Sequence, residues 1–115
     1  MNETNPYLSV VVPLYNEEGN VKELHRKIHE AVQKVGQPFE IIFIDDGSTD
    51  NSWKVIEQLS NENPNVKAIK FLKNFGKSQA LHAGFNKAQG DVVITMDADL
   101  QDNPEEIPEL YELIT

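Results

Sequence analysis

Two aspartates near the end of the chain could together hold a hard divalent cation. Asp97 and Asp99 directly follow the apolar run at 92–96, and in an extended or tightly turned segment both carboxylates can point the same way. Magnesium in proteins characteristically binds one or two carboxylates together with phosphate oxygens of a substrate. Most aspartate pairs of this spacing are solvated loop acids, so the elements around the pair must decide between the two interpretations.

The composition describes one small acidic domain. The chain has 115 residues, 39% of them hydrophobic, which suffices for one core and is short for a complete two-substrate enzyme. Lys and Arg total 10 against 19 Asp and Glu, and the net charge of -9 argues against nucleic acid or an anionic membrane as the direct partner. The absence of cysteine excludes disulfides and thiolate metal sites. No signal peptide is visible, and no apolar stretch approaches the roughly 20 residues of a membrane-spanning helix.

The charges are unevenly distributed along the chain. Seven acids fall within residues 97–112 without a Lys or Arg among them. Four of the ten basic residues fall within one stretch of eleven, namely Lys67, Lys70, Lys73 and Lys77. A site that binds both a metal ion and a phosphate could use charges of both signs, the carboxylates for the metal and the lysines for the phosphate.

Four short apolar runs predict the strands that must position these side chains. They lie at 8–12, 40–44, 66–72 and 91–96. The first, second and fourth are nearly continuous and rich in β-branched residues, which predicts strands covered on both faces. The third alternates, as an edge strand with one wetter face would.

Amphipathic segments between the strands predict helices. In the first, Asn20 with Glu23 three residues on resembles a capping box, and Gly36 ends the run. Two shorter helices follow at 55–59 and 80–88. The pair Asn103 and Pro104 predicts the start of a fourth helix, with a cap residue and a proline at the first helical position.

Strands and helices alternate strictly, which predicts an α/β domain with a parallel sheet and helices on both faces. Such sheets bind ligands outside the carboxyl ends of their strands. A polar cluster follows each predicted strand, at 13–18, 45–50, 73–78 and 97–101. Chance would scatter such clusters over both edges of the sheet, so their convergence on one edge predicts a functional site there.

Three of these segments carry a family resemblance. Residues 10–18 (VVVPLYNEE), 44–50 (IDDGSTD) and 97–99 (DAD) resemble the nucleotide-sugar domain of the inverting family-two glycosyltransferases, which have the GT-A fold. The resemblance covers nearly the whole chain and implies a Rossmann-like sheet in strand order 3-2-1-4. Residues 73–77 (KNFGK) and 97–102 (DADLQD) resemble more narrowly the branch that transfers sugars to polyprenyl phosphates, which includes dolichyl-phosphate mannosyltransferases and undecaprenyl-phosphate sugar transferases.

The resemblance also implies roles for individual residues. Asp97, Asp99 and Gln101 would coordinate Mg²⁺ or Mn²⁺ that bridges the donor's diphosphate and stabilises the leaving nucleoside diphosphate. Asp45 or Asp46 would hold the base and ribose, and which of the two points inward stays open; Lys73 or Lys77 would reach the phosphates or sugar, unless each is a solvated loop lysine. The full nucleotide-binding set is Pro13, Tyr15, Glu17, Asp45, Asp46, Lys73, Gly76, Lys77 and Asp97.

Other residues have plainer interpretations. His25 and His29 have the i,i+4 spacing of a helical metal pair, but no further ligand is evident, and we expect surface histidines. Trp53 and Phe85 sit among apolar neighbours at helical spacing, and we expect them to pack rather than to stack on a sugar.

Family members continue past the aspartate pair into a half that binds the acceptor, whereas this chain ends at Thr115. We therefore expect residues 1–115 to be the nucleotide-sugar-binding part of the transferase, inactive alone, with any catalytic residue beyond Thr115. A polyprenyl phosphate is already an anionic nucleophile and needs no strong base. We expect the protein in the cytoplasm, the full-length form at the cytoplasmic face of the membrane, and the fragment to self-associate through its exposed fourth strand.

Two alternatives belong to other functional classes. A receiver-like phosphoacceptor domain also binds Mg²⁺ through adjacent aspartates, but receivers place that pair after the first strand, whereas here it follows the second. A non-catalytic nucleotide-sugar-binding module would share every feature of the donor site.

Overall fold

The predicted parallel sheet and its strand order are confirmed. The computed structural model describes residues 8–98 and 103–114. It contains one four-stranded sheet in the order β3-β2-β1-β4, with all three pairings parallel. The strands are β1 Leu8–Leu14, β2 Phe39–Asp45, β3 Val66–Lys70 and β4 Val92–Thr95.

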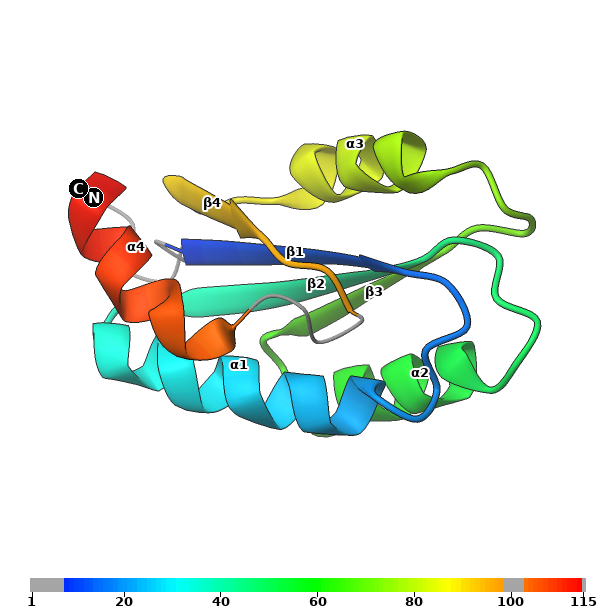
Figure 1. Ribbon diagram of the computed structural model, residues 1–115, viewed down its shortest axis with the longest axis horizontal. Coiled ribbons are helices and arrows are strands. Elements are labelled where there is room, and N and C mark those ends of the chain that lie inside the picture. The colour runs from blue at the N-terminus through cyan, green and yellow to red at the C-terminus, as the bar shows by residue number, and fades with distance from the viewer. Residues whose placement is uncertain (1–7, 99–102, 115) are drawn as a thin grey trace.

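The register of the sheet brings the carboxyl ends of its strands to one edge. Leu8 lies opposite both Phe39 of β2 and Val92 of β4, and Asp45 at the end of β2 lies opposite Lys70 of β3. Figure 1 shows the loops that follow β1, β2 and β3 together at the right-hand end of the molecule. Three of the four predicted polar clusters therefore meet there, as expected for parallel strands.

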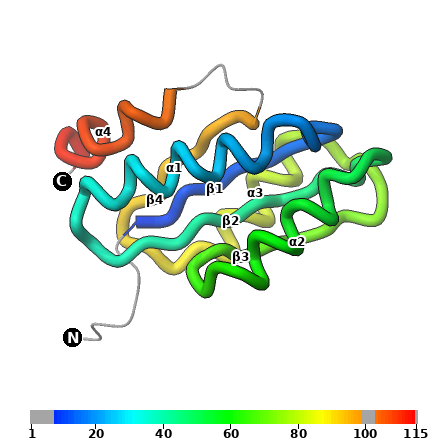
Figure 2. The backbone as a smooth tube through the Cα atoms, turned by 90° about the horizontal axis from the view of Figure 1, so that it is seen from below, coloured from blue at the N-terminus to red at the C-terminus, as the bar shows by residue number. Residues whose placement is uncertain are grey.

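Helices cover both faces of the sheet, as predicted. In Figure 1, α1 and α2 lie below the sheet and α3 above it, and Figure 2 shows α1 and α2 from below. A 3₁₀ turn, η1, leads into α4, and both pack against α1. The helices are α1 Val21–Val35, α2 Ser52–Glu62, α3 Lys77–Lys87, η1 Pro104–Glu106 and α4 Ile107–Ile114.

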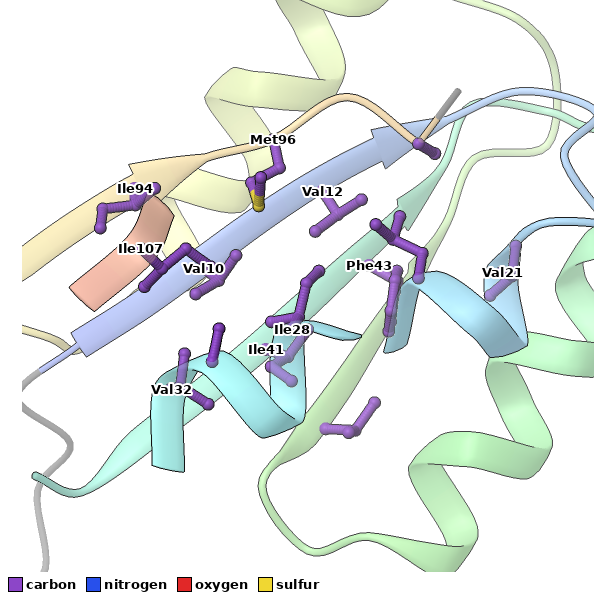
Figure 3. Close-up of a cluster of buried hydrophobic side chains, with 14 of the residues drawn as sticks. Val10, Val12, Val21, Ile28, Val32, Ile41, Phe43, Ile94, Met96 and Ile107 are labelled. Carbon is purple, nitrogen blue, oxygen red and sulfur yellow. The ribbon is translucent and has the colours of Figure 1, made fainter. Parts of the chain in front are cut away.

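The larger core lies between the sheet and α1. Alternate residues of β1 and β2, such as Val10 and Phe43, point to this face because side chains along a strand alternate between its two sides. They meet the apolar stripe of α1, where Ile28 is fully buried, and Ile107 closes the same cluster (Figure 3). This packing fixes α1 beneath β1 and β2.

On the opposite face, α3 packs directly against the sheet because its contact residues are small. Ala80 is fully buried against Val11 and Ile44. A Cβ added to Gly84 would stand 2.4 Å from Val11 Cγ1 and 2.8 Å from Ile44 Cδ1, so glycine is required at this position. The close contact sets where the first turn of α3, with Lys77, lies at the sheet edge.

The prediction that the fourth strand is covered on both faces is wrong. In β4, Val92 and Ile94 are buried, but Val93 and Thr95 are exposed. The reason is that α3 packs over β1 and β2, which leaves the upper face of β4 open. Phe85 on α3, which was expected to pack, is 49% exposed, whereas Trp53 does pack partly against the core.

The predicted helix ends are partly confirmed. Gly36 ends α1 with a φ of 77°, and the Asn103 side chain accepts a hydrogen bond from Glu105 N at 3.0 Å, as predicted. The predicted capping box of Asn20 and Glu23 is wrong, because the Asn20 side chain makes no cap bond. Asn20 instead donates to Glu17 Oε2 at 2.8 Å, which ties the start of α1 to the loop after β1.

The prediction that His25 and His29 are surface residues is also wrong. Both are half-buried, with ring centroids 5.8 Å apart, and His29 packs edge-on against Phe39 at 5.6 Å. Within the described residues, His25 Nε2 and His29 Nδ1 are buried without a hydrogen-bond partner. Burial lowers the pKa of His25, and the neighbouring His29 lowers it further, while Glu62 acts in the opposite direction.

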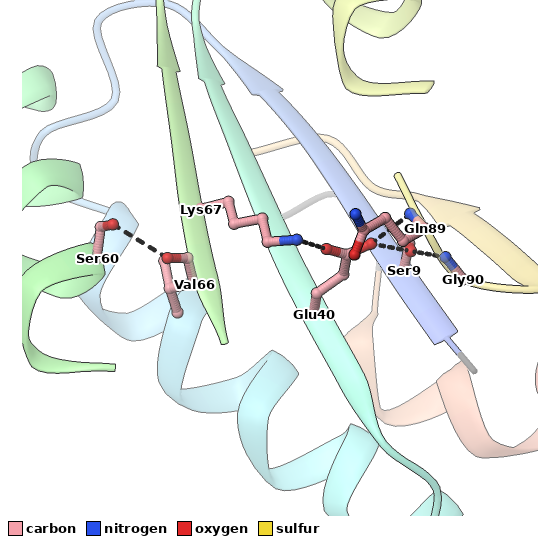
Figure 4. A network of polar contacts seen from close by, with 7 residues as sticks. All are labelled: Ser9, Glu40, Ser60, Val66, Lys67, Gln89 and Gly90. Carbon is pink, nitrogen blue, oxygen red and sulfur yellow. Dashed lines mark hydrogen bonds and ion pairs between the residues drawn. The ribbon is translucent and has the colours of Figure 1, made fainter. Parts of the chain in front are cut away.

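A buried carboxylate joins the amino ends of the strands. Glu40 is 2% exposed, and it accepts hydrogen bonds from Ser9 Oγ at 2.6 Å, Lys67 Nζ at 2.5 Å and Gln89 N at 2.7 Å (Figure 4). Gly90 N donates in turn to Ser9 Oγ at 2.8 Å. Burial alone would raise the pKa of Glu40, but these hydrogen bonds and the charge of Lys67 lower it.

Candidate functional site

A cleft of about 270 Å³ opens at the carboxyl edge of the sheet. Its walls come from the end of β1, from the segments that follow β1, β2 and β4, and from the first turn of α3. The lining residues are Pro13, Leu14, Tyr15, Glu17, Asp46, Lys77, Asp97 and Ala98. Segments that are far apart in sequence thus converge on one concave surface, where ligands of parallel sheets are bound.

The loop after β1 is held to the loop after β2 by a ladder of hydrogen bonds centred on Asn16. This residue has a φ of 53°, a conformation that asparagine tolerates better than most residues. Asn16 N donates to Ser48 Oγ at 2.8 Å, and Asn16 Oδ1 accepts from Thr49 N at 2.8 Å. Glu17 N donates to Ser52 Oγ at 2.9 Å. These bonds fix the backbone that carries Tyr15 and Glu17 at the cleft.

Asp50 completes this ladder. Its carboxylate accepts from Ser52 N at 2.9 Å and from Glu18 N at 3.3 Å. Burial alone would raise the pKa of Asp50, but the hydrogen bonds from Ser52 and Glu18 lower it. Asp50 is therefore ionised at neutral pH and holds the two loops together.

The neighbouring aspartates at the end of β2 play different parts, as expected for consecutive residues at a strand end. Asp45 is 1% exposed, and its Oδ1 accepts from Ser48 N at 2.9 Å, which closes the turn. Asp46 lines the cleft, and its carboxylate accepts from Phe75 N at 2.8 Å and Gly76 N at 3.1 Å. Of the two, Asp46 is the one that faces the cleft.

Gly47 allows the loops after β2 and β3 to pack against each other. Its φ is 76°, in the left-handed region, and an added Cβ would stand 2.3 Å from the carbonyl carbon of Lys73. Both the conformation and the backbone contact require glycine.

The two lysines proposed for the phosphates lie differently. Lys77 lines the cleft and forms an ion pair with Asp97 Oδ1. Lys73 instead lies with its Nζ 5.2 Å from the centroid of the Phe75 ring, outside the cleft lining. The ion pair shows that Asp97 is placed to receive a positive charge inside the cleft.

Most predicted nucleotide-binding residues are thus brought together. Pro13, Tyr15, Glu17, Asp46, Lys77 and Asp97 line the cleft, whereas Asp45, Lys73 and Gly76 support it or lie beside it. Sequence reasoning missed Leu14 and Ala98 as lining residues and Asn16 as the residue that joins two loops. The signal for Asn16 was an asparagine in a polar loop, a residue type suited to positive φ.

Two of the three predicted metal ligands, Asp99 and Gln101, lie outside the described residues. Within residues 8–98 and 103–114, no group of three His, Cys, Asp or Glu side chains could hold a metal ion. Asp97 fits a divalent cation, because its carboxylate lies in the cleft, is 38% exposed and already pairs with the ammonium of Lys77.

The fold and the cleft together define a Rossmann-like α/β domain with a concave site at the carboxyl edge of its sheet. Residues 9–115 match the family described as "Glycosyl transferase family 2", and the chain belongs to this family. It is 48% identical over 104 residues to an undecaprenyl-phosphate 4-deoxy-4-formamido-L-arabinose transferase of Proteus mirabilis, which covers 90% of this chain and 32% of that protein.

Two solved structures have a similar fold. TarS of S. aureus, in complex with UDP-GlcNAc, gives a TM-score of 0.76 and 28% identity over 93% of this chain and 30% of that chain. The mannosyltransferase PcManGT of Pyrobaculum calidifontis, in complex with GDP-Man and Mn²⁺, gives 0.69 and 26% over 83% of this chain and 28% of that chain. The sheet order is that of the Rossmann-like N-terminal half of the GT-A fold, and the chain spans about a third of the length of these relatives.

None of the helices in the described part of the chain is both long enough and apolar enough to cross a membrane.

Proposed function

We propose that residues 1–115 form the donor-binding part of a glycosyltransferase that moves a sugar from a nucleotide-diphosphate sugar to a polyprenyl phosphate. The observation that carries this proposal is the cleft at the carboxyl edge, which gathers Tyr15, Asp46, Lys77 and Asp97 from four segments. Solved relatives of similar fold were crystallised with UDP-GlcNAc and with GDP-Man, which supports a nucleotide sugar as the ligand.

One side of the cleft suits a nucleoside. Pro13 and the 44% exposed ring of Tyr15 offer an apolar surface for a base. Glu17 and Asp46 offer carboxylate oxygens to base N–H groups and ribose hydroxyls. Because Phe75 N and Gly76 N already hold the Asp46 carboxylate, it needs little reorganisation on binding.

The other side suits a diphosphate. Lys77 supplies an ammonium for phosphate oxygens, and Asp97, with Asp99 and Gln101, would hold a divalent cation. Mg²⁺ or Mn²⁺ bound there would neutralise the charge that develops on the departing nucleoside diphosphate. On binding, Lys77 would exchange part of its pairing with Asp97 for the donor's phosphates.

The acceptor is proposed from the relatives. The Proteus mirabilis protein is named as an undecaprenyl-phosphate sugar transferase, which supports a polyprenyl phosphate acceptor. Work of the full-length protein at the cytoplasmic face of a membrane is part of the proposal. The phosphate of such an acceptor is an anionic nucleophile, so no residue of this chain is assigned as a catalytic base. Residues 1–115 alone are proposed to bind the donor without transferring its sugar.

A second candidate is a non-catalytic nucleotide-sugar-binding module. Such a module would use the same cleft, and sugar transfer by a longer form of the protein would exclude it. A receiver-like domain is less consistent with the geometry, because Asp45 is committed to Ser48 N and an acyl-phosphate donor would meet only Asp46. Labelling with acetyl phosphate would identify that alternative.

Calorimetric titration of UDP-, GDP- and dTDP-sugars, with and without Mn²⁺, tests the proposed function. We expect one of them to bind in a metal-dependent way, and Asp97→Ala and Asp99→Ala each to abolish that dependence while far-ultraviolet circular dichroism stays unchanged. Asp91→Ala, at the exposed amino end of β4, is the matched control and should bind as the unchanged chain does. If both variants kept the Mn²⁺-dependent affinity of the unchanged chain, the assignment of Asp97 and Asp99 as metal ligands would be overturned.

A further inference from the structure

The ion pair between Lys77 and Asp97 joins two segments whose backbones are anchored. Lys77 is the first residue of α3, which the buried Ala80 packs against the sheet. Asp97 lies between Met96 and Ala98, and the side chains of both these neighbours are buried. The side chains of the pair itself are 59% and 38% exposed, so Lys77 can leave Asp97 without disturbing the core.

The cleft that contains this pair is mainly acidic. Among the described residues, its lining contains three carboxylates, from Glu17, Asp46 and Asp97, and one ammonium, from Lys77. A nucleoside diphosphate carries charge of the same sign as the carboxylates, so its binding depends on cations in the cleft. The cation that the described lining supplies is already engaged with Asp97.

Lys77 and a divalent cation would compete for the same carboxylate. The ammonium of Lys77 contacts Asp97 Oδ1, and carboxylate oxygens are the ligands that Mg²⁺ and Mn²⁺ prefer. To coordinate a metal before the donor binds, Asp97 would have to release Lys77 and leave its ammonium beside the metal ion, where like charges repel. Lys77 therefore lowers the affinity of Asp97 for a metal as long as no other anion receives the ammonium.

The position of Lys77 on α3 favours an exchange of one anion for another. The positive end of the helix dipole lies at the first turn, where a lysine is disfavoured unless an anion stands beside it. The first turn of α3 contains no acidic residue, so that anion must come from outside the helix. Asp97 is such an anion, and the diphosphate of a donor would be another.

We propose that Lys77 occupies the place of the divalent cation on Asp97 until the donor binds, and thereby couples the binding of metal and donor. The inference rests on the proposed function, because it takes the ligand to be a nucleoside diphosphate that binds together with a metal. The ammonium moves from the carboxylate to the phosphates, and Asp97 then becomes available to the metal. The two ligands therefore raise each other's affinity by the same factor.

Lys77→Met tests the proposal, because it removes the ammonium and keeps a side chain of similar length. Without nucleotide, electron paramagnetic resonance of Mn²⁺ should show a metal affinity raised by about threefold to fivefold, as expected when an exposed ion pair no longer competes. With Mn²⁺ saturating, calorimetry should show the affinity for UDP or GDP lowered by about tenfold, because a charged hydrogen bond to phosphate is lost.

The opposite signs of the two changes distinguish this role from simpler ones. A lysine that only binds phosphate would leave the Mn²⁺ affinity unchanged, and a lysine that only supports the fold would lower both affinities when it is replaced. Lys87→Met is the matched control, because it makes the same change of charge at an exposed site in the last turn of α3. It should alter neither affinity, since salt screens charges over roughly 8 Å, less than the length of this helix.

An equal rise of Mn²⁺ affinity in Lys87→Met would overturn the proposal. So would an Mn²⁺ affinity that is the same in Lys77→Met and the unchanged chain, or too weak to measure in both. Failure of the proposed function would be seen separately, because the unchanged chain would then bind none of UDP, GDP and dTDP in the presence of Mn²⁺. If the unchanged chain binds one of them while Lys77→Met leaves the Mn²⁺ affinity as it was, the proposed function stands and this inference fails.

Discussion

Both ends of the sheet contain a buried carboxylate, but they use it differently. At the amino end, Glu40 accepts from Ser9, Lys67 and Gln89, and the cation of Lys67 balances its charge. At the carboxyl end, Asp46 faces the cleft. The described hydrogen bonds to its carboxylate all come from backbone N–H groups of the loop after β3.

Volume does not distinguish the two ends. A hollow of about 250 Å³ lies beside Glu40 and Lys67, close to the 270 Å³ of the cleft. The difference lies in the polar groups: those at the amino end are paired with one another inside the protein, whereas Asp46, Lys77 and Asp97 at the carboxyl end line the cleft. A buried carboxylate is evidence of a binding site only where its neighbours leave capacity for a ligand.

The largest expected effect concerns the packing of the carboxyl-end loops. Gly47→Ala should lower the free energy of unfolding by about 3–4 kcal/mol, from left-handed strain together with a backbone clash at Lys73. Gly36→Ala is the matched control, because its φ is 77° but an added Cβ meets nothing within 4 Å, so the strain alone should cost about 1–2 kcal/mol. Urea denaturation measures the free energy of unfolding of both variants. Equal losses would mean that the loop at Lys73 moves to make room for the added methyl group.

The next effect concerns the amino end. Glu40→Leu should lower the free energy of unfolding by about 2–3 kcal/mol, because the buried N–H of Gln89 and the hydroxyl of Ser9 lose their acceptor. Donor affinity should not change, since Glu40 is absent from the cleft lining. Calorimetry on the variant would contradict the comparison if donor binding fell in step with stability.

The same carboxylate predicts a pH dependence. Because the pKa of Glu40 is lowered in the folded protein, its stabilisation is present above the ordinary value of 4.5 and is lost as pH falls through the lower folded value. Thermal unfolding followed between neutral and acidic pH should show this loss, and Glu40→Gln should flatten the curve in that window. A curve of unchanged slope in Glu40→Gln would assign the acid sensitivity to other groups.

His25 predicts a smaller loss at higher pH. Its pKa is lowered in the folded protein, so the unfolded chain takes up the proton more readily, and stability should begin to fall as pH drops below the ordinary value of 6.5. The groups that face it are His29 on α1, Glu62 on α2 and the ring of Phe43 on β2. His25→Leu should reduce the slope between neutral pH and pH about 5, whereas His82→Leu, at an exposed site on α3, should leave it unchanged.

The smallest effect concerns the edge at β4. Within the described residues β4 pairs only with β1, and Val93 is 38% exposed, so we expect weak self-association that strengthens with salt as self-repulsion is screened. Sedimentation velocity over a range of protein and salt concentrations measures it, and Val93→Lys should abolish it. A monomer throughout, with amide exchange at 92–94 as slow as at 10–12, would show that this edge is protected.

Much of the fold was predictable because its signals are local. The near-continuous apolar runs of β1 and β2 report strands buried on both faces, and Gly36 reports a helix end, whatever lies around them. The exposure of Val93 depends on where α3 packs, and the burial of His25 depends on the aromatic residues of β2. Neither fact can be read from the sequence of β4 or of α1 alone.

The site was predictable to the level of loops but not of side chains. Parallel strands place the segments that follow them at one edge, so Asp46, Lys77 and Asp97 could be brought together from their order alone. Whether Asp45 or Asp46 faces the cleft depends on the hydrogen bond from Ser48 N, and the role of Glu40 depends on partners 31, 27 and 49 residues away in sequence.

The most direct test of the difference between the two ends is a map of amide chemical-shift changes on addition of the nucleotide sugar that binds, together with Mg²⁺. The changes should concentrate at Tyr15, Glu17, Asp46, Lys77 and Asp97 and leave Ser9, Glu40, Lys67 and Gln89 unmoved. Changes centred on the amino-end residues, or none at the cleft under saturating donor, would contradict the account.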